Sequence, residues 1–459
     1  MDTDTITAVA TPTGVGGIGI IRISGPQSLG IAQHFFRPSN QATRFDSHRI
    51  YHGHIIDPDN GRPLDEVLFI FMRAPRSYTR ENVVEIQAHG GGIVLRQILE
   101  MVIRRGARLA EAGEFTQRAY LNGRIDLTQA EAVIDIINAK SIRALQVATS
   151  QAQGHLRMRI DAIIDEVNDL CADLQARIEF PDELEDEPDP TQIGEAIRQK
   201  ALAPLEILLD GCRNHLPLRL GIRLPIIGKP NVGKSSLLNA LANQERAIVT
   251  AIPGTTRDII EETIDIGGIP FILQDTAGLH TSRDPIETLG IEKTEDCINE
   301  APLVLFLVDA SRPLDDDDAQ IYEKLAKTPL ILLWNKIDLV GEGPLPICPE
   351  HWKKELQVRV SALTGDGLEK LRKLVGQKLA VVPDDGADVQ IVPNLRHKVA
   401  LEEALANFNR ALQGCRSMLP VDLINDELQA GALALETITG RREGGDLMDR
   451  VFRRFCIGK

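Results

Sequence analysis

The sequence predicts a multidomain chain of α/β and all-α parts: an N-terminal α+β domain, a helical domain in two stretches, and an α/β domain inserted between those stretches. A glycine-containing loop, followed by strand-like runs that end in polar motifs, predicts the α/β domain. Apolar residues at helical spacing on both sides of it predict the helical domain. We expect boundaries at 1–120, 121–217, 218–383 and 384–459, the second and fourth segments forming one domain.

The first 120 residues mix short β-type runs with turns, which is typical of an α+β domain. Residues 18–23 and 67–71 are predicted strands. Gly92–Arg104 is a predicted helix, because one of its faces carries the apolar residues Val94, Ile98, Met101 and Val102. These elements need a common core within this segment.

Helical periodicity appears on both sides of the inserted region. Thr128 and Glu131 fit a capping box at the start of the first helix. The apolar positions that follow are Ala130, Val133, Ile134, Ile137, then Ile160, Ile163, Ile164, Val167, Cys171 and Leu174, and, after residue 394, Leu401, Leu405, Phe408 and Leu412. Apolar faces need partners, so we expect both stretches to pack into one helical domain.

A phosphate-binding loop, G-K-P-N-V-G-K-S-S, occupies residues 228–236. It matches G-x-x-x-x-G-K-S and lies between a predicted strand, Ile222–Ile227, and a helix predicted to begin at Ser235. Its glycines let backbone N–H groups face phosphate oxygens, and the helix N-terminus adds positive potential. Lys234 would reach the β- and γ-phosphates, and Ser235 would offer a hydroxyl to Mg²⁺.

Four further motifs follow in the order expected of a guanine-nucleotide site. They are Gly254-Thr255-Thr256-Arg257-Asp258, then Asp275-Thr276-Ala277-Gly278, Asn335-Lys336-Ile337-Asp338, and Ser361-Ala362-Leu363. The last three follow predicted strands at 271–273, 330–334 and 358–360. Any one of these motifs alone is more often an ordinary turn. Together with the phosphate loop they predict a Ras-like P-loop GTPase domain, in which the Asp338 carboxylate accepts both N–H groups of the guanine edge.

Leu279 stands where many GTPases carry the glutamine that orients the attacking water. Because leucine cannot form a hydrogen bond, another group must position that water. Asn231, inside the phosphate loop, could hold a monovalent cation that stabilises developing charge. Asn231 as a plain turn residue is the alternative.

Composition narrows the function classes. The 459 residues are 43% hydrophobic and carry a net charge of −15, so any contact with nucleic acid must be a local patch. The six cysteines are scattered without a C-x-x-C pair, which argues against a zinc ribbon or a disulfide scaffold. No signal segment or membrane-length apolar run is present, so we expect a cytoplasmic protein without membrane contact. The acidic run at 182–189 is predicted to be a solvated connection between helices, and the run at 315–318 an exposed loop or helix start; a metal site in either run is the less favoured alternative.

Both ends of the chain resemble one family. The motifs are D-T-I-T-A-V-A-T-P-T-G-V-G-G-I-G-I-I-R-I-S-G, E-I-Q-A-H-G-G, G-E-F-T-Q-R-A-Y-L-N-G-R-I-D-L-T-Q-A-E-A and the terminal C-I-G-K. They are similar to those of the MnmE (TrmE) family of tRNA-modification GTPases. The resemblance implies a cytoplasmic homodimer, formed through its N-terminal domains, that assembles with an FAD-containing partner, MnmG (GidA), as a heterotetramer or larger complex. Together they would add a carboxymethylaminomethyl or aminomethyl group to C5 of the wobble uridine (position 34) of certain tRNAs, with 5-formyl- or methylene-tetrahydrofolate as one-carbon donor.

The resemblance also implies roles for particular residues. The N-terminal domain would bind the folate through Arg22, Glu85, Arg124 and Lys459. The K⁺ ligands would be Asn231, Thr250, Ile252 (through its backbone) and Thr255. The Mg²⁺ ligands would be Ser235, Thr256 and Asp275, the last directly or through water. The catalytic residues would be Glu287, which orients the water through a second molecule, with Lys234, Asn231 and Cys456. The GTP contacts would be Asn231, Val232, Gly233, Lys234, Ser235, Ser236, Thr250, Ala251, Ile252, Pro253, Gly254, Thr255, Thr256, Asp275, Thr276, Ala277, Gly278, Asn335, Lys336, Ile337, Asp338, Ser361, Ala362 and Leu363.

Three alternatives stay open at this point. Glu287 is otherwise a surface residue of a helix, and Cys456 is otherwise a structural buried thiol. The chain as a whole could be a GTP-switched ribosome-assembly or RNA-binding factor, although no C-terminal RNA-binding domain is evident.

Overall fold

The computed structural model describes residues 4–12, 14–40, 43–180, 189–243, 260–266, 268–275, 298, 301–325, 328–341, 343–379, 391–441 and 445–459. The chain divides into two compact units. One consists of Met1–Ile137, Thr149–Leu209 and Leu395–Lys459, and the other of Asn138–Ala148 and Asp210–Asn394. The first unit is thus assembled from segments on both sides of the second. The expected boundary at residue 384 lies outside the described residues.

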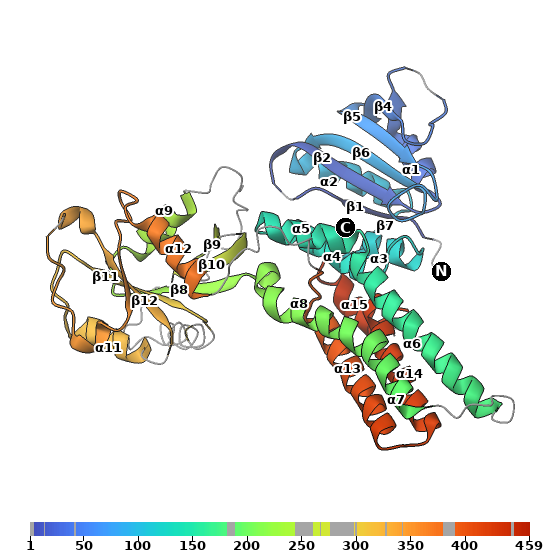
Figure 1. The fold of residues 1–459 in the computed structure, drawn as a ribbon. Helices are drawn as coiled ribbons and strands as arrows, with labels where there is room; N and C mark the ends of the chain where they lie inside the picture. Colours follow the sequence, from blue (N-terminus) through green and yellow to red (C-terminus); the bar gives the residue numbers. More distant parts are fainter. Residues whose placement is uncertain are drawn as a thin grey trace. The chain divides into compact units, whose positions relative to one another are not determined.

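The N-terminal part is a sheet covered by two helices (Figure 1). Its strands run in the order β3-β4-β5-β6-β2-β1-β7, and all pairs are antiparallel except β1 with β7. The strands are β1 (Ile6–Val9), β2 (Gly16–Ser24), β3 (Phe36–Pro38), β4 (Ile50–Ile56), β5 (Pro63–Met72), β6 (Val83–Gly90) and β7 (Arg108–Leu109), and the helices are α1 (Ser28–Phe35) and α2 (Gly92–Arg104). The predicted strands at 18–23 and 67–71 and the predicted helix are confirmed.

Helix α2 buries a slightly different face from the predicted one. Ile98, Met101 and Val102 are buried as expected, but Leu95 completes the stripe and Val94 lies at its edge. Leu95 packs so closely on β2 that a Cβ on Gly19 would lie 2.4 Å from its side chain. Gly19 therefore lets the helix approach the sheet.

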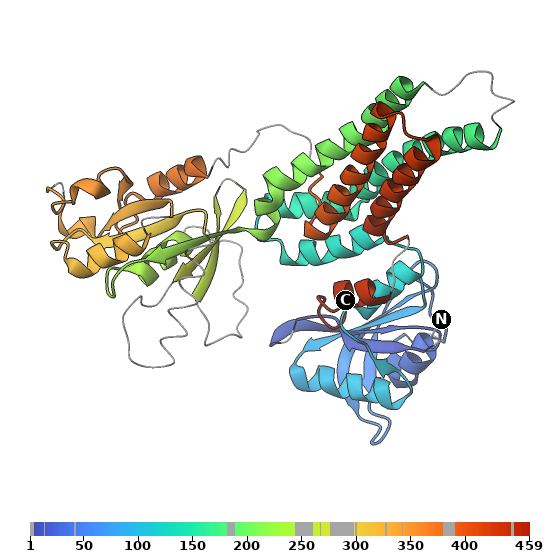
Figure 2. The same ribbon diagram turned by 90° about the horizontal axis from the view of Figure 1, so that it is seen from below.

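The helical part packs its first and last segments together. Its helices are α3 (Glu114–Leu121), α4 (Leu127–Asn138), α5 (Ile142–Ala152), α6 (His155–Glu179), α7 (Pro190–Ile197), α8 (Ala203–Leu220), α13 (Leu395–Arg416), α14 (Val421–Thr439) and α15 (Gly445–Phe452). Helix α14 contacts both α6 and α13, and α13 contacts α7, as Figures 1 and 2 show. The C-terminal helices thus bury the apolar stripe of α6, whose Ile160, Ile163, Ile164, Val167, Cys171 and Leu174 are all buried.

The N-terminus of α4 corrects a prediction. The capping box consists of Asp126 and Gln129, not Thr128 and Glu131. Asp126 Oδ1 accepts from the backbone N–H of Gln129 at 3.0 Å, and Gln129 Oε1 accepts from the N–H of Asp126 at 3.0 Å. Residues 126–129 and residues 128–131 both fit the capping pattern, and the helix begins at the first of these two segments.

Glu131 instead joins the two stretches of the helical part. Its carboxylate accepts hydrogen bonds of 2.9 and 3.1 Å from Arg396, at the start of α13, and lies 2.8 Å from Nε2 of the fully buried His397. Burial alone would raise the pKa of Glu131, but the charges and hydrogen bonds of His397 and Arg396 outweigh it and hold the pKa far below its usual value. The ion cluster therefore stabilises the fold while Glu131 is ionised.

Replacing Glu131 with Gln should lower the free energy of unfolding by about 3 kcal/mol at pH 7, because Arg396 and the buried His397 lose the carboxylate that they contact. The pKa of Glu131 is depressed in the folded state, so this contribution is present above its unfolded pKa and fades as the pH falls below about 5. Urea unfolding followed by circular dichroism at pH 7 and pH 4 measures both effects. Glu402→Gln, at an exposed α13 position, should cost under about 0.5 kcal/mol, and an equal loss in both variants would contradict the assignment.

The second unit contains a mostly parallel sheet between helices. Its strands, in the order β13-β12-β11-β8-β10-β9, are β8 (Ile222–Ile227), β9 (Ile260–Ile266), β10 (Ile269–Asp275), β11 (Val304–Asp309), β12 (Leu330–Asn335) and β13 (Leu356–Arg359), with only β9 antiparallel to its neighbour. The helices that pack on this sheet are α9 (Lys234–Asn243), α11 (Asp316–Leu325) and α12 (Leu368–Lys378), and the unit also includes most of α5 and the end of α8. The predicted strands beginning at 222, 271, 330 and 358 all fall in this sheet.

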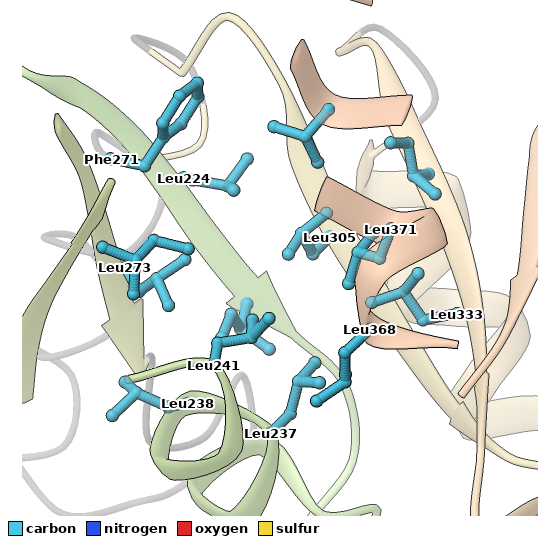
Figure 3. Packing of buried hydrophobic residues seen from close by; sticks show 14 of the residues in the cluster. Leu224, Leu237, Leu238, Leu241, Phe271, Leu273, Leu305, Leu333, Leu368 and Leu371 are labelled. Carbon is cyan, nitrogen blue, oxygen red and sulfur yellow. The ribbon is translucent and has the colours of Figure 1, made fainter. Parts of the chain in front are cut away.

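Alternation along β11 explains the layers. Leu305 and Leu307 face the core formed with α9 and α12, which Figure 3 shows from close by. Phe306 and Val308 face the opposite core, formed with α11. A strand buried on both faces is a continuous apolar run, as expected for a central parallel strand. Among the described residues, no helix is both long and apolar enough to cross a membrane.

Candidate functional site

The phosphate loop connects the end of β8 to the start of α9. A Cβ on Gly228 would lie 2.3 Å from the Leu307 carbonyl oxygen, so only glycine fits where the loop leaves the sheet. Asn231 and Gly233 both have positive φ, 62° and 100°. Left-handed residues in such a turn direct successive N–H groups toward one side, which creates a concave site for an anion. The loop thus has the backbone shape that phosphate binding requires.

Lys234 lies over this loop. Its ammonium donates to the carbonyl oxygens of Gly228 at 2.8 Å and Lys229 at 2.9 Å, and the residue is 8% exposed. The loop itself therefore fixes the lysine in place. A phosphate oxygen is a stronger acceptor for an ammonium than a neutral carbonyl, so the arrangement suits a phosphate bound in the loop.

Asn335 joins three loops at one edge of the sheet. Its amide nitrogen donates to the Val232 carbonyl oxygen at 2.7 Å, and its carbonyl oxygen accepts from the Ala362 N–H at 3.0 Å. The residue is 1% exposed. Its side chain therefore ties the phosphate loop and the 361–363 loop to the end of β12.

Asp338 and Ser361, both predicted to contact the guanine base, are joined by a hydrogen bond. The buried Ser361 hydroxyl donates to Asp338 Oδ1 at 2.6 Å and accepts from the Thr364 N–H at 3.1 Å. Asp338 itself is exposed. The hydrogen bond orients a carboxylate at the surface, where a base edge can reach it.

Asp309 also lies at this edge of the sheet, and no sequence motif indicated it. It ends β11, and its Oδ2 accepts from the Lys336 ammonium at 2.7 Å. Lys336 also donates to the Asn231 carbonyl oxygen at 2.8 Å. Burial would raise the pKa of Asp309, but the hydrogen bond and charge of Lys336 bring it below its usual value. Asp309 could have been found from the sequence because it ends an apolar run, Val304–Asp309, that is typical of a buried strand.

The acidic run at 315–318 leads into α11, which confirms the predicted helix start; Asp315, Asp316 and Asp317 are exposed as expected, but Asp318 is buried. Lys229, in the phosphate loop, lies 2.6 Å from Asp315 and 2.9 Å from Asp318, whose side chain is 4% exposed. Asp315 also accepts from the N–H groups of Asp317 and Asp318, so it caps α11. This cluster connects the phosphate loop to α11.

Several expected site residues lie outside the described residues. They are Thr250, Ala251, Ile252, Pro253, Gly254, Thr255, Thr256, Thr276, Ala277, Gly278, Leu279 and Glu287. Asp275 ends β10, opposite Ile226 of β8, and only its backbone is described. The roles of these residues stay predictions.

A second group of predicted residues meets in the N-terminal part. Arg22 on β2 and Glu85 on β6 are cross-strand partners, and Nε and Nη2 of Arg22 each lie 2.8 Å from Glu85 Oε1. Both side chains are 16% exposed. The pairing depends on strand register across 63 residues of sequence, which the sequence reading did not predict.

Tyr78 connects Arg22 to Arg124. The two guanidinium carbons lie 5.9 and 4.9 Å from its ring centroid, and Arg124 also donates to the Ser77 carbonyl oxygen at 3.0 Å. The Tyr78 hydroxyl and the buried Thr116 hydroxyl are 2.9 Å apart. A planar guanidinium can stack on the ring in this way, which gives Arg124 a geometry that lysine would lack.

The C-terminal peptide reaches the same site (Figure 2). Arg22 donates to the Gly458 carbonyl oxygen at 3.2 Å, and Ile457 pairs with Ala112 in a β-bridge. A Cβ on Gly458 would lie 2.3 Å from the Val9 carbonyl oxygen, so glycine is required there. Lys459 therefore directly follows a residue that contacts Arg22. Cys456 is exposed, so its reading as a buried structural thiol is wrong.

The sheet order and the loop after β8 define the second unit as a P-loop nucleotide-binding domain of the GTPase class. Two family descriptions match the chain: GTP-binding protein TrmE N-terminus over residues 5–124, and MnmE helical domain over residues 127–456. The chain belongs to the MnmE (TrmE) family of tRNA modification GTPases.

Full-length relatives agree with this assignment. The chain is 43% identical over 465 residues to the tRNA modification GTPase MnmE of Desulfotalea psychrophila, covering 100% of this chain and 99% of the relative. It is 44% identical over 459 residues to that of Geobacter sulfurreducens, with 99% of each covered. The solved G domain of the T. maritima FeoB iron transporter is 25% identical, covering 34% of this chain and 98% of that one, but its TM-score of 0.27 adds nothing to the assignment.

Proposed function

We propose that this protein hydrolyses GTP at the loop edge of the sheet in its second unit. The main support is the contact of Asn335 with both Val232 and Ala362, because it joins the phosphate loop to a loop expected beside the guanine. Lys234 would bind the β- and γ-phosphates, and Asp338 would accept the guanine N–H groups. Purified protein should hydrolyse GTP much faster than ATP, and equal rates would contradict the proposal.

The residues at the loop fit the proposed cations. Ser235, exposed on the first turn of α9, offers the oxygen donor that Mg²⁺ prefers, with Thr256 and Asp275 as the further ligands. The exposed Asn231 carries an amide oxygen that suits K⁺, with Thr250, Ile252 and Thr255 completing that site. Bound there, the two cations would offset negative charge on the phosphates. Because Leu279 cannot hold the attacking water, we assign that role to Glu287, acting through a second water.

Replacing Asp338 with Asn should relax base specificity. An amide presents a donor where the carboxylate accepts, so guanine loses one partner and xanthine gains one. We expect GTP affinity to fall on the order of 100-fold and xanthosine triphosphate affinity to rise, because each such hydrogen bond to a charged group contributes about 1.5–3 kcal/mol. Competition binding with both nucleotides measures this, and unchanged discrimination would remove Asp338 from the base site.

Replacing Asn231 with Ala should abolish the rate advantage of K⁺ over Na⁺. The amide oxygen is lost, while the backbone N–H groups that bind phosphate are kept. GTP affinity should change less than about threefold, since no phosphate contact through the side chain is proposed. GTP hydrolysis rates of the unmodified protein and of the variant, each measured in KCl and in NaCl, test this prediction. A K⁺ response equal to that of the unmodified protein would contradict the cation site.

We further propose that hydrolysis drives tRNA modification. With an FAD-containing partner of the MnmG (GidA) type, the protein would help to add a carboxymethylaminomethyl or aminomethyl group to C5 of uridine 34, using a tetrahydrofolate one-carbon unit. Family membership and the cluster of Arg22, Glu85, Arg124 and the C-terminal peptide support this. The cations suit folate carboxylates, and Glu85 suits the pterin N–H edge. The exposed Cys456 belongs to the same C-terminal peptide, so we propose that it acts near the folate.

The remaining organisation follows the family. We propose a cytoplasmic homodimer formed through residues 1–120, the folate-binding domain. Segments 121–217 and 384–459 would form the helical domain, with the GTPase domain, 218–383, inserted between them.

A further inference from the structure

Three exposed arginines extend from the proposed folate site. Arg76 and Arg80 lie in the loop between β5 and β6, and Arg124 follows α3. Arg80 donates to the Asn122 carbonyl oxygen at 3.0 Å, and Arg124 donates to the Ser77 carbonyl oxygen at 3.0 Å. These reciprocal bonds tie the two segments together. Arg80 and Arg124 thus belong to one surface, which the Tyr78 ring connects to the Arg22 cluster, and Arg76 precedes Ser77 in the same loop.

The loop that carries Arg76 and Arg80 is well braced. The Ala74 N–H donates to Asn82 Oδ1 at 3.0 Å, and the Ser77 hydroxyl donates to the Glu81 carbonyl oxygen at 2.5 Å. Arg80 has a φ of 59°, a left-handed conformation that costs free energy for a side chain of this kind. A braced loop that keeps an arginine in an unfavourable conformation indicates a functional position.

Among the described residues, the neighbouring carboxylates of Glu81 and Glu85 do not neutralise this surface. Glu81 is turned inward, where it accepts from the Ser24 hydroxyl at 2.6 Å and pairs with Arg118 at 3.2 Å. Glu85 is paired with Arg22. The exposed side chains of Arg76, Arg80 and Arg124 therefore keep their positive charge, although the whole chain has a net charge of −15. Such a local concentration of arginine fits a ligand with several carboxylates.

We propose that Arg76, Arg80 and Arg124 bind the poly-γ-glutamate tail of the folate donor. The inference rests on the proposed folate site and extends it. Arg124 would bind the first glutamate, and Arg80 and Arg76 the carboxylates that follow. The site would then select polyglutamylated folate over the monoglutamate.

Calorimetry with the full-length protein tests this, using 5-formyltetrahydrofolate as monoglutamate and as pentaglutamate. The unmodified protein should bind the pentaglutamate about tenfold more tightly, because two further exposed ion pairs form. In Arg76→Gln/Arg80→Gln this advantage should fall below about twofold, with monoglutamate affinity unchanged. Arg44→Gln/Arg49→Gln, exposed arginines of the same domain, should keep the advantage. GTP hydrolysis should be the same in all variants.

The outcomes are distinguishable. Equal affinity of the unmodified protein for the two forms would overturn this inference and leave the proposed function intact. An advantage that survives in Arg76→Gln/Arg80→Gln would overturn it as well, and a loss of tRNA binding in that variant would assign the arginines to RNA instead. If the unmodified protein bound neither form, the proposed folate site itself would be contradicted, and this inference with it.

Discussion

Replacing Lys234 with Ala should reduce the rate constant of GTP hydrolysis about 10³-fold, the loss typical of removing one group that stabilises transition-state charge. The lysine is positioned by the Gly228 and Lys229 carbonyl oxygens, so its ammonium is already placed when phosphate binds. The alanine variant should keep the backbone conformation of the loop, because only the lysine side chain makes the contacts with the Gly228 and Lys229 carbonyl oxygens. Nucleotide affinity should also fall, since the ammonium contacts ground-state phosphates as well.

Single-turnover hydrolysis at saturating GTP separates the two effects. Lys324→Ala, at an exposed position on α11, provides the control and should hydrolyse GTP at the normal rate. A Lys234→Ala protein that retained more than a tenth of the normal rate would contradict the role assigned to this lysine.

Replacing Arg22 with Gln should strongly weaken folate binding while leaving GTP hydrolysis by the isolated protein unchanged. Arg22 contacts Glu85, the ring of Tyr78 and the Gly458 carbonyl oxygen. Its replacement therefore removes a proposed folate contact and also a hydrogen bond that holds the C-terminal peptide. We expect affinity for 5-formyltetrahydrofolate to fall on the order of 100-fold, which corresponds to about 2.7 kcal/mol. Calorimetry measures this loss.

A second variant separates ligand binding from stability. In Arg22→Gln, Glu85 remains as a partly buried carboxylate without its cation, which also destabilises the fold. Arg22→Gln/Glu85→Gln removes both charges and should recover stability but not folate binding. Recovery of binding together with stability would show that the pair has only a structural role.

The elements around the nucleotide site could be predicted well from the sequence, because the polar motifs directly follow the apolar runs that form the strands. Motifs such as Asn335-Lys336-Ile337-Asp338 end apolar runs, and parallel strands bring such ends to one edge. Asp309 was missed because a single aspartate after an apolar run has no distinctive pattern. Asn335 was expected to contact the nucleotide, but its burial and its bonds to Val232 and Ala362 became visible only in three dimensions.

The N-terminal site could be predicted only by resemblance. Strand register pairs Arg22 with Glu85, and no local pattern specifies a register across so many residues. Tyr78 lies in a loop, where side-chain direction depends on bonds such as that to Thr116. The capping box of α4 was misplaced by two residues because two overlapping segments both fit the pattern.

The most direct test of the account is the nucleoside composition of tRNA from a strain that lacks this protein. We expect 5-carboxymethylaminomethyl- and 5-aminomethyl-type wobble uridines to disappear, and we expect the unmodified gene to restore them but the Lys234→Ala gene not to. Normal levels of these nucleosides in the deletion strain would contradict the proposed function.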